Sequence, residues 1–226
     1  MADRGHSEYF RTPDCRLGFD LYLLQPQKKT TKTGQPVLDK TGKQVEEWGA
    51  TFIFDNATPK TLFEKAILEA CINAKWGDEA KIKELIAAGL IKSPFLKGDG
   101  PEARYKKGDK AGQIQPGYGP DVWFIRTNTR IAPPVRYKDP NIQATKDEVY
   151  AGCYGFAALN AYTWEGDTGK GVTFGLQYFQ KLRDGERLFS GGGAAVDPNA
   201  FFEKIEDTGS APEETKGGAG AGGLFG

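Results

Sequence analysis

The stretch VYAGCYGFAALNAYTW, residues 149–164, indicates the fold more clearly than any other part of this sequence. Its odd positions are mostly small and apolar, whereas its even positions carry the rings of Tyr150, Tyr154, Phe156, Tyr162 and Trp164. Side chains of an extended strand alternate between two faces, so the pattern predicts one small apolar face and one aromatic face. Small residues suit a tight barrel interior, and hydroxylated rings suit a wet surface that makes flat contacts.

Two other interpretations of this stretch stay open at this point. The rings could fill the core, with the small residues packed under a neighbouring strand. A bulge at Gly152 or Gly155 could also exchange the two faces partway along the strand.

The segments on either side of this stretch predict further strands. Alternating or β-rich patterns occur in CRLGFDLYLL (15–24), WGATFIFD (48–55), DVWFIRTNTR (121–130) and GVTFGLQYFQKL (171–182). Between the second and third of these strands, residues at about 58–89 have apolar positions at helical spacing, with Thr58 and Pro59 at the start and Gly89 at the end. We therefore expect a mainly β fold with a helical insertion (α+β), and a small Greek-key barrel is its natural form.

Two basic segments and a change of composition complete the predicted organisation. Residues 26–45 read as a lysine-rich loop or hairpin arm, and residues 92–120 read as a long basic loop, a type of segment that often carries function. Residues 1–202 are expected to form one domain. Residues 203–226 are glycine-rich, contain five acids and two lysines, and are expected to be disordered.

Aromatic side chains alternate with cationic ones in a pattern typical of a groove for single-stranded nucleic acid, in which rings stack on bases and cations meet phosphates. In 171–183 the parity places Val172, Phe174, Leu176, Tyr178 and Leu182 on the apolar face. The residues predicted to stack on bases are Tyr22, Tyr150, Tyr154, Phe156, Tyr162, Trp164 and Phe179. Those predicted to contact phosphates are Arg16, Lys28, Lys29, Lys32, Arg126, Arg130, Lys181, Arg183 and Arg187. A merely solvated charged face is the competing interpretation.

Signals for an enzyme are weak. The GDTGKG at 166–171 lacks the Gly-Lys-Ser/Thr ending of a phosphate loop at the right offset. His6 is the only histidine and lies near a start that the sequence does not anchor, which argues against a histidine triad or a histidine-rich metal site. Three widely spaced cysteines favour reduced thiols. We expect no catalytic residues, metal or cofactor.

Four segments resemble one family of bacteriophage and prophage proteins. They are RIAPPVRYKDPN (130–141), EVYAGCYGFAALNAYTW (148–164), GVTFGLQYFQKLRDGERL (171–188) and GGAAVDPNAFF (192–202). The family, once catalogued as uncharacterised, is understood as single-stranded DNA-binding proteins of the phage replication module. The resemblance implies an OB-fold and a role in coating single-stranded DNA during phage replication or recombination. We expect the protein to act in the host bacterial cytoplasm.

The end of the chain adds a prediction about partners. Because the chain is formally neutral and residues 203–226 carry a net charge of −3, the remainder carries +3. Such asymmetry suggests a polyanionic partner. The tail is similar in plan to that of bacterial single-stranded DNA-binding proteins, and Leu224 and Phe225 are its expected docking residues for phage replication or recombination proteins. A frayed, solubilising terminus is the simpler interpretation.

The expected partners are therefore single-stranded DNA, phage proteins bound through the tail, and further copies of the chain along the DNA. A strand-annealing or duplex-binding recombination protein is the alternative within the same class, and a metal-dependent DNA-processing enzyme is the alternative from another class. No apolar run approaches the roughly 18 residues that a membrane span needs, so no membrane partner is expected.

Overall fold

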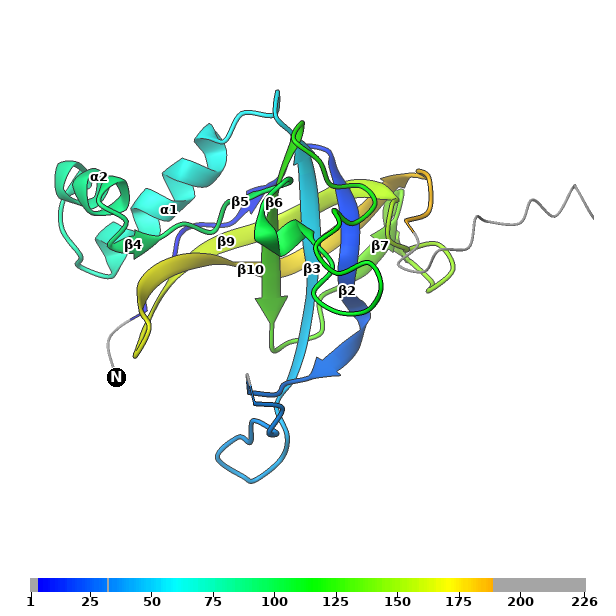
Figure 1. Ribbon diagram of the computed structural model, residues 1–226, viewed down its shortest axis with the longest axis horizontal. Helices are drawn as coiled ribbons and strands as arrows, with labels where there is room; N and C mark the ends of the chain where they lie inside the picture. Colours follow the sequence, from blue (N-terminus) through cyan, green and yellow to red (C-terminus); the bar gives the residue numbers. More distant parts are fainter. Residues whose placement is uncertain (1–3, 32, 189–226) are drawn as a thin grey trace, which may run out of the picture. The chain divides into compact units, whose positions relative to one another are not determined.

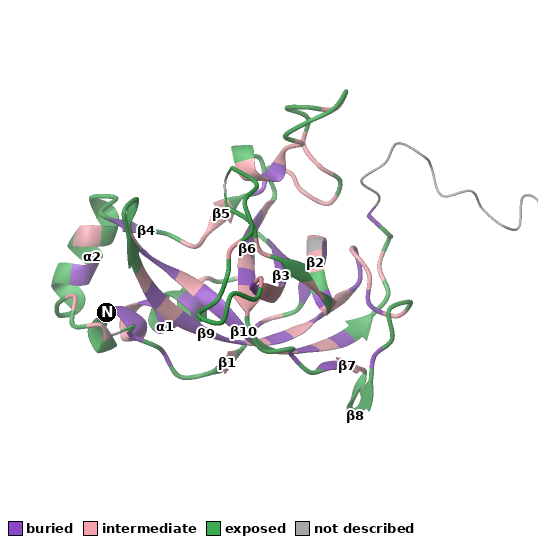
Figure 2. Cartoon of the chain, turned by 90° about the horizontal axis from the view of Figure 1, so that it is seen from below, coloured by how far each residue is buried: buried purple, intermediate pink, exposed green. Residues whose placement is uncertain are grey.

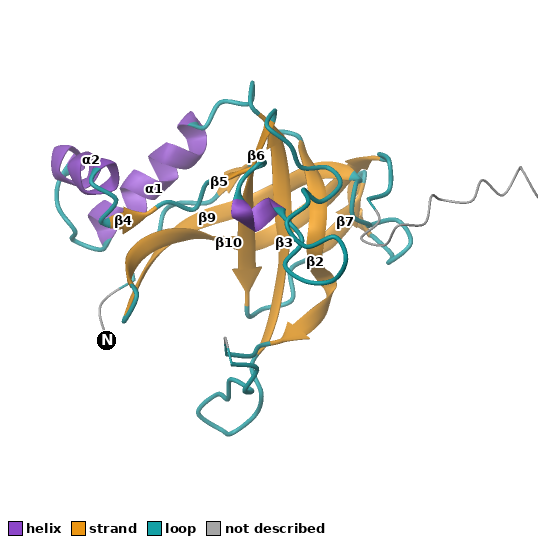
Figure 3. Cartoon of the chain, viewed as in Figure 1, coloured by secondary structure: helices purple, strands orange, loops and turns teal. Residues whose placement is uncertain are grey.

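A computed structural model describes residues 4–31 and 33–188, and every structural statement below refers to these residues. The fold is mainly β with two helices, as the sequence predicts (Figures 1 and 3). The strands are β1 (Phe10–Arg11), β2 (Cys15–Lys28), β3 (Glu46–Asp55), β4 (Ile91–Lys92), β5 (Leu96–Lys97), β6 (Val122–Thr129), β7 (Val135–Tyr137), β8 (Asp139–Gln143), β9 (Tyr154–Gly166) and β10 (Gly169–Arg183). The helices are α1 (Thr61–Asn73), α2 (Glu79–Ala87) and the short 3₁₀ turn η1 (Pro101–Ala103).

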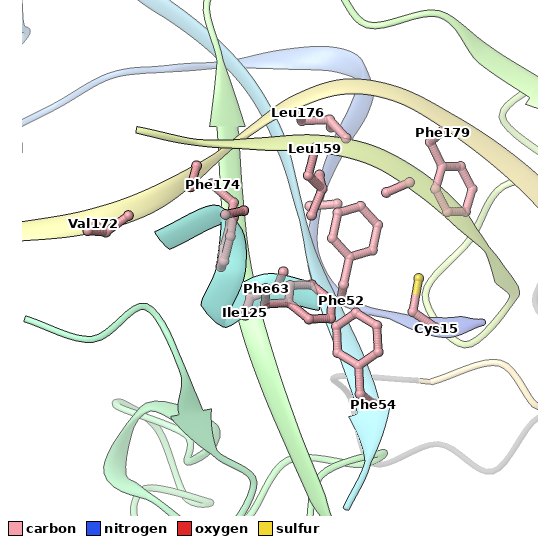
Figure 4. Close-up of a cluster of buried hydrophobic side chains, with 14 of the residues drawn as sticks. Cys15, Phe52, Phe54, Phe63, Ile125, Leu159, Val172, Phe174, Leu176 and Phe179 are labelled. Carbon is pink, nitrogen blue, oxygen red and sulfur yellow. The ribbon is translucent and has the colours of Figure 1, made fainter. Parts of the chain in front are cut away.

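Five long strands form a hydrogen-bonded path that returns to its starting point. β2 pairs with β3, β3 with β6, β6 with β10 and β10 with β9, and β9 pairs back to β2 through Cys15 and Arg16. The β6–β10 pairing is parallel, and the others are antiparallel. Side chains that point to the inside of this closed path of strands make the core, which includes Phe52, Leu159 and Phe174 (Figure 4).

The helical insertion closes one side of this core. Phe63 of α1 is fully buried, and its ring centroid lies 5.2 Å from that of Phe54 and 5.6 Å from that of Phe174. The helical spacing of Phe63, Ala66 and Ala70 explains why this face of α1 is buried. Asp78 caps α2, as its position before the helix predicts, by accepting a hydrogen bond from the Lys81 amide at 2.9 Å.

The first described residues form an extended segment between β9 and α1. Ser7 donates its amide to Ala161 O at 2.9 Å, and Thr163 donates its amide to Gly5 O at 3.0 Å. A Cβ at Gly5 would lie 2.0 Å from Ala70 O, so only glycine fits this close approach. The start of the domain is thus anchored, contrary to the expectation for the residues around His6.

The basic loop at 92–120 is folded onto the outside of β3 and β6. Ala103 and Phe124 are fully buried in a second small cluster with Ile53, and the ring of Tyr118 lies 4.8 Å from that of Phe124. Arg104 donates hydrogen bonds within the loop, to Gly112 O and Asp99 O. The loop therefore covers one end of the outer sheet face and leaves the other end, beyond Arg126, open.

One bulge changes the predicted faces of β10. Val172, Phe174 and Leu176 are buried as predicted. The pairing with β9 then skips Gln177, since Leu176 pairs with Leu159 and Tyr178 pairs with Ala158. The extra residue reverses the alternation from that point on. Figure 2 shows buried (purple) and intermediate (pink) residues alternating along β9 and β10.

The predictions for Phe179 and Lys181 are therefore wrong, because both side chains point into the protein. Phe179 is fully buried and stacks on Phe52 at 5.9 Å. Lys181 is 2% exposed; its Nζ lies 2.6 Å from Asp184 Oδ1 and 5.0 Å from the ring centroid of Tyr150. The hydrogen bond from Lys181 holds the pKa of Asp184 below its usual range. Lys181 is paired and enclosed and does not face solvent as a phosphate contact would.

Candidate nucleic-acid interface

The structure separates the aromatic face of β9 into two regions. On this strand the predicted faces are right, because Gly155, Ala157, Leu159, Ala161 and Thr163 are buried while the rings between them are partly exposed. Towards its start β9 lies between β2 and β10, and towards its end it lies between β10 and the N-terminal segment. The two regions present their rings very differently.

The first region is an arginine-covered patch. The guanidinium carbon Cζ of Arg183 lies 3.5 Å from the ring centroid of Tyr154, and that of Arg11 lies 4.3 Å from the ring centroid of Phe156. The Cζ of Arg187 lies 3.8 Å from the ring centroid of Tyr150. Cations on ring faces are favourable cation–π contacts, and here they occupy surfaces that a base would need.

The cations of this patch are also held by protein oxygens. Arg183 forms an ion pair with Asp14 at 2.8 Å, and Arg16 donates to Gly152 O and Glu186 O. Arg187 donates to Asp147 O at 3.2 Å. The structure thus gives Tyr150, Tyr154, Phe156, Arg16, Arg183 and Arg187 partners within the domain, and their contact with DNA stays a prediction.

The second region is a concave site of about 580 Å³, called the groove below. Its predicted members are Lys29, Arg130, Tyr162 and Trp164. Those that the sequence reasoning missed are Arg4, His6, Tyr9, Glu47, Asn128, Thr129, Asn160, Thr173, Gly175 and Gln177. They come from the N-terminal segment, the base of the 26–45 arm, the end of β6, and the β9–β10 hairpin, so no contiguous stretch of sequence contains them.

Tyr162 forms the floor of the groove. Its ring crosses β10 above Gly175, and its hydroxyl donates to Asn128 Oδ1 on β6 at 2.7 Å. The imidazole of His6 lies 5.9 Å from this ring at an interplanar angle of 29°, so the two rings form one stacked surface. Burial raises the pKa of Tyr162, which keeps the hydroxyl protonated and able to donate.

The electrostatics of the groove favour an anion. Arg4, Lys29 and Arg130 line it with one acid, Glu47, which forms an ion pair with Lys29. The ring of Trp164 stands at the hairpin end, with Lys92 Nζ 5.6 Å from its centroid. Rings, cations and amides in one concavity are the combination that single strands require.

A smaller hollow of about 270 Å³ continues the groove across the sheet and shares Glu47 and Asn128 with it. It is lined by Tyr22 and Arg126, both predicted, and by Trp48, which the sequence reasoning missed. Arg126 donates to Glu102 O at 3.0 Å. Tyr22 is 38% exposed.

Four further predicted residues are placed elsewhere or lie outside the described part of the chain. Lys28 is exposed at the end of β2, opposite Glu46, and lines neither concavity. Lys32, Leu224 and Phe225 lie outside the described residues. In the described part of the chain, no group of three or more His, Cys, Asp or Glu side chains is placed to hold a metal ion. Its helices are all too short or too polar to cross a membrane.

Comparison with known proteins adds the family. The model of the family described as Enterobacter phage Enc34, ssDNA-binding protein, matches residues 37–211, most of the chain. The chain belongs to this family. The family is thus defined by a DNA-binding protein and not by an enzyme, in agreement with the sequence-based prediction.

The individual proteins that this chain resembles share little sequence identity with it. The chain is 26% identical over 177 residues to putative protein p50 of Acyrthosiphon pisum secondary endosymbiont phage 1, covering 77% of this chain and 86% of that protein. The single-stranded DNA-binding protein from bacteriophage Enc34 has a similar structure, with a TM-score of 0.50, 14% identity, and coverage of 84% and 89% of the two chains. Its complex with ssDNA matches with a TM-score of 0.48, 13% identity, and coverage of 79% and 88%. The Enc34-family fold is therefore present at very low sequence identity.

Proposed function

We propose that this member of the Enc34 family binds single-stranded DNA in the groove and coats it without catalysing a reaction. The observation that carries the proposal is the groove itself, in which Tyr162 and Trp164 lie among Arg4, Lys29 and Arg130. Bases stack on aromatic faces with little regard to sequence, and cations neutralise the phosphates between them. The family match supports the same activity.

The strand order supports an OB-fold barrel as the scaffold. Numbered along the chain, the ring of long strands runs 1-2-3-5-4-1, with the third and fifth strands parallel. In OB-folds, oligonucleotides lie over strands 2 and 3 and between the loops that connect strands 1–2 and 4–5. The corresponding parts here are β3 and β6, the 26–45 arm and the β9–β10 turn, and the groove lies among them.

Coating of unwound DNA during phage replication or recombination, in the host cytoplasm, is the role we propose. The acidic tail at 203–226 is proposed as the handle for phage enzymes, with Leu224 and Phe225 as the docking residues, and further copies are proposed to bind along the same strand. Both proposals rest on the sequence of the tail and on the family.

A salt-dependent binding comparison tests the activity. Fluorescence anisotropy with labelled oligo-dT and a duplex of equal length should show tighter binding of the single strand. A plot of log affinity against log salt should have a slope of about −0.7 per phosphate neutralised. Equal or tighter duplex binding would instead favour the duplex-binding alternative, and a response independent of salt would contradict the groove. Plasmid incubated with Mg²⁺ or Mn²⁺ should remain intact.

A further inference from the structure

His6 is the only histidine of the chain, and the fold places it firmly in the groove. Its carbonyl accepts a hydrogen bond from Asn73 Nδ2 of α1 at 2.7 Å, and the segment around it pairs with β9 opposite Tyr162. The imidazole stacks on Tyr162 and stays exposed on its other side. This position brings the ring next to the surface on which a bound strand would lie.

The contacts of the imidazole define which of its two nitrogens accepts a hydrogen bond. Asn160 Nδ2 lies 3.3 Å from His6 Nδ1, and Asn160 Oδ1 accepts from Gln177 Nε2 at 3.3 Å. With its oxygen engaged by Gln177, Asn160 offers His6 a donor, so Nδ1 acts as the acceptor. The other ring nitrogen, Nε2, is then the one that carries the proton.

The charged and titratable groups around His6 come from every neighbouring element. They are Arg4, Glu8 and Tyr9 of the N-terminal segment, Glu69 of α1, Tyr162 of β9, Arg130 after β6, and Lys29 and Glu47 at the base of the arm; β10 contributes the uncharged Thr173 and Gln177. The cations among them attract phosphate.

Other described groups are poorly suited to titrate near neutral pH. Burial raises the pKa of Cys71 to about 11, and burial also raises the pKa of Cys15 and Cys153. Burial also raises the pKa of Tyr162, further above neutral pH. Histidine is the side-chain type whose charge changes between pH 5 and 8.

We propose that His6 is a DNA-contacting residue and that its imidazole takes up a proton from solvent at Nδ1 when a phosphate occupies the groove, with the side-chain amides of Asn160 and Gln177 turning over so that Asn160 Oδ1 faces the new N–H. The proposal rests on the proposed function. A phosphate beside the ring stabilises the imidazolium, so the complex binds the proton more tightly than the free protein. By linkage, the affinity for DNA is highest at pH values at which His6 of the free protein is already protonated. The gain is lost as the pH rises through the range in which His6 of the DNA complex loses its proton.

The test is the affinity for oligo-dT between pH 5.5 and 8.0 at constant ionic strength, because thymine does not ionise in this range. Wild-type affinity should rise roughly two- to fivefold as pH falls, the range for a partly exposed charge pair. His6→Gln should give a flat profile near the wild-type value at pH 8.0. His6→Arg, which is always charged, should give a flat profile near the wild-type value at pH 5.5.

Calorimetry in two buffers of different ionisation enthalpy should show a maximal uptake of roughly 0.2–0.4 proton for the wild type, the amount that a two- to fivefold change implies, and none for either variant. A flat wild-type profile with tight binding would overturn the role of His6 and leave the proposed function intact. A His6→Gln profile as steep as the wild type would do the same. Failure to bind oligo-dT at every pH would overturn the proposed function and this inference with it.

Discussion

Gly175 is the residue on which the floor of the groove depends. It lies in β10 between Asn128 of β6 and Asn160 of β9. A Cβ at this position would lie 2.7 Å from Asn160 Oδ1 and 3.5 Å from the Tyr162 ring atoms Cδ1 and Cε1. The missing side chain therefore leaves room for the Asn160 amide, which contacts His6 above the Tyr162 ring, whereas an added Cβ would make only an ordinary van der Waals contact with that ring.

We expect Gly175→Ala to weaken binding of oligo-dT by about 0.5–1.5 kcal/mol, the value of one hydrogen bond, because the Asn160 amide that lines the groove must move. Gly166→Ala, in the same hairpin, is the matched control, since nothing lies within 4 Å of its added Cβ. Anisotropy titrations give the affinities, and circular dichroism checks that both variants fold. Wild-type affinity in Gly175→Ala would show that the position of Asn160 does not matter for binding.

At the scale of one element, β9 carries both a ring that is covered by a guanidinium and a ring that lines the groove. Near its start, Phe156 is covered by the guanidinium of Arg11, whereas near its end Trp164 opens into the groove. The two rings are on the same face and similarly half-buried, so sequence parity treats them alike. Their surroundings assign them different roles.

We expect Trp164→Ala to reduce the affinity for oligo-dT by about 1–3 kcal/mol, while Phe156→Ala changes it much less. The reason is that only Trp164 lines the groove where bases would stack. Both affinities are measured at one salt concentration, and quenching of intrinsic fluorescence by oligo-dT should fall in Trp164→Ala. An equal loss in the two variants would mean that the arginine-covered patch also binds DNA.

At the scale of the whole molecule, we expect the distribution of charge along the chain to affect the affinity for DNA. Residues 203–226 carry −3 and the rest of the chain +3, so the two parts attract each other over distances within a Debye length, about 10 Å at 0.1 M salt. We therefore expect this acidic segment to compete with DNA for the cations of the groove. That competition is strongest where salt screening is weakest.

Removal of residues 203–226 should therefore raise the affinity for oligo-dT, most clearly at low salt, with the difference shrinking as salt increases. Titrations of the full-length and truncated chains at several salt concentrations measure the effect. The double substitution Leu224→Ala and Phe225→Ala, which keeps the charge, is the control and should leave DNA affinity unchanged. Unaltered low-salt affinity after truncation would contradict the competition.

The sequence by itself determined the five long strands, the helical insertion and the two faces of β9, because alternation with a period of two and helical spacing are local properties. The short strands β1, β4, β5, β7 and β8 were not predicted. It also indicated the Enc34-type family, through four segments spread over 130–202. Lys29, Arg130, Tyr162 and Trp164 were correctly placed on the outer surface, where the groove lies.

Only the tertiary structure decided which of the surface residues act together. The bulge at Gln177 moved Phe179 and Lys181 inside, and a single extra residue in a ladder leaves no mark in the alternation before it. Pairing of the N-terminal segment with β9 brought His6 to the groove across more than 150 positions of sequence. Such long-range contacts depend on how strands meet in space, and local pattern carries no information about them.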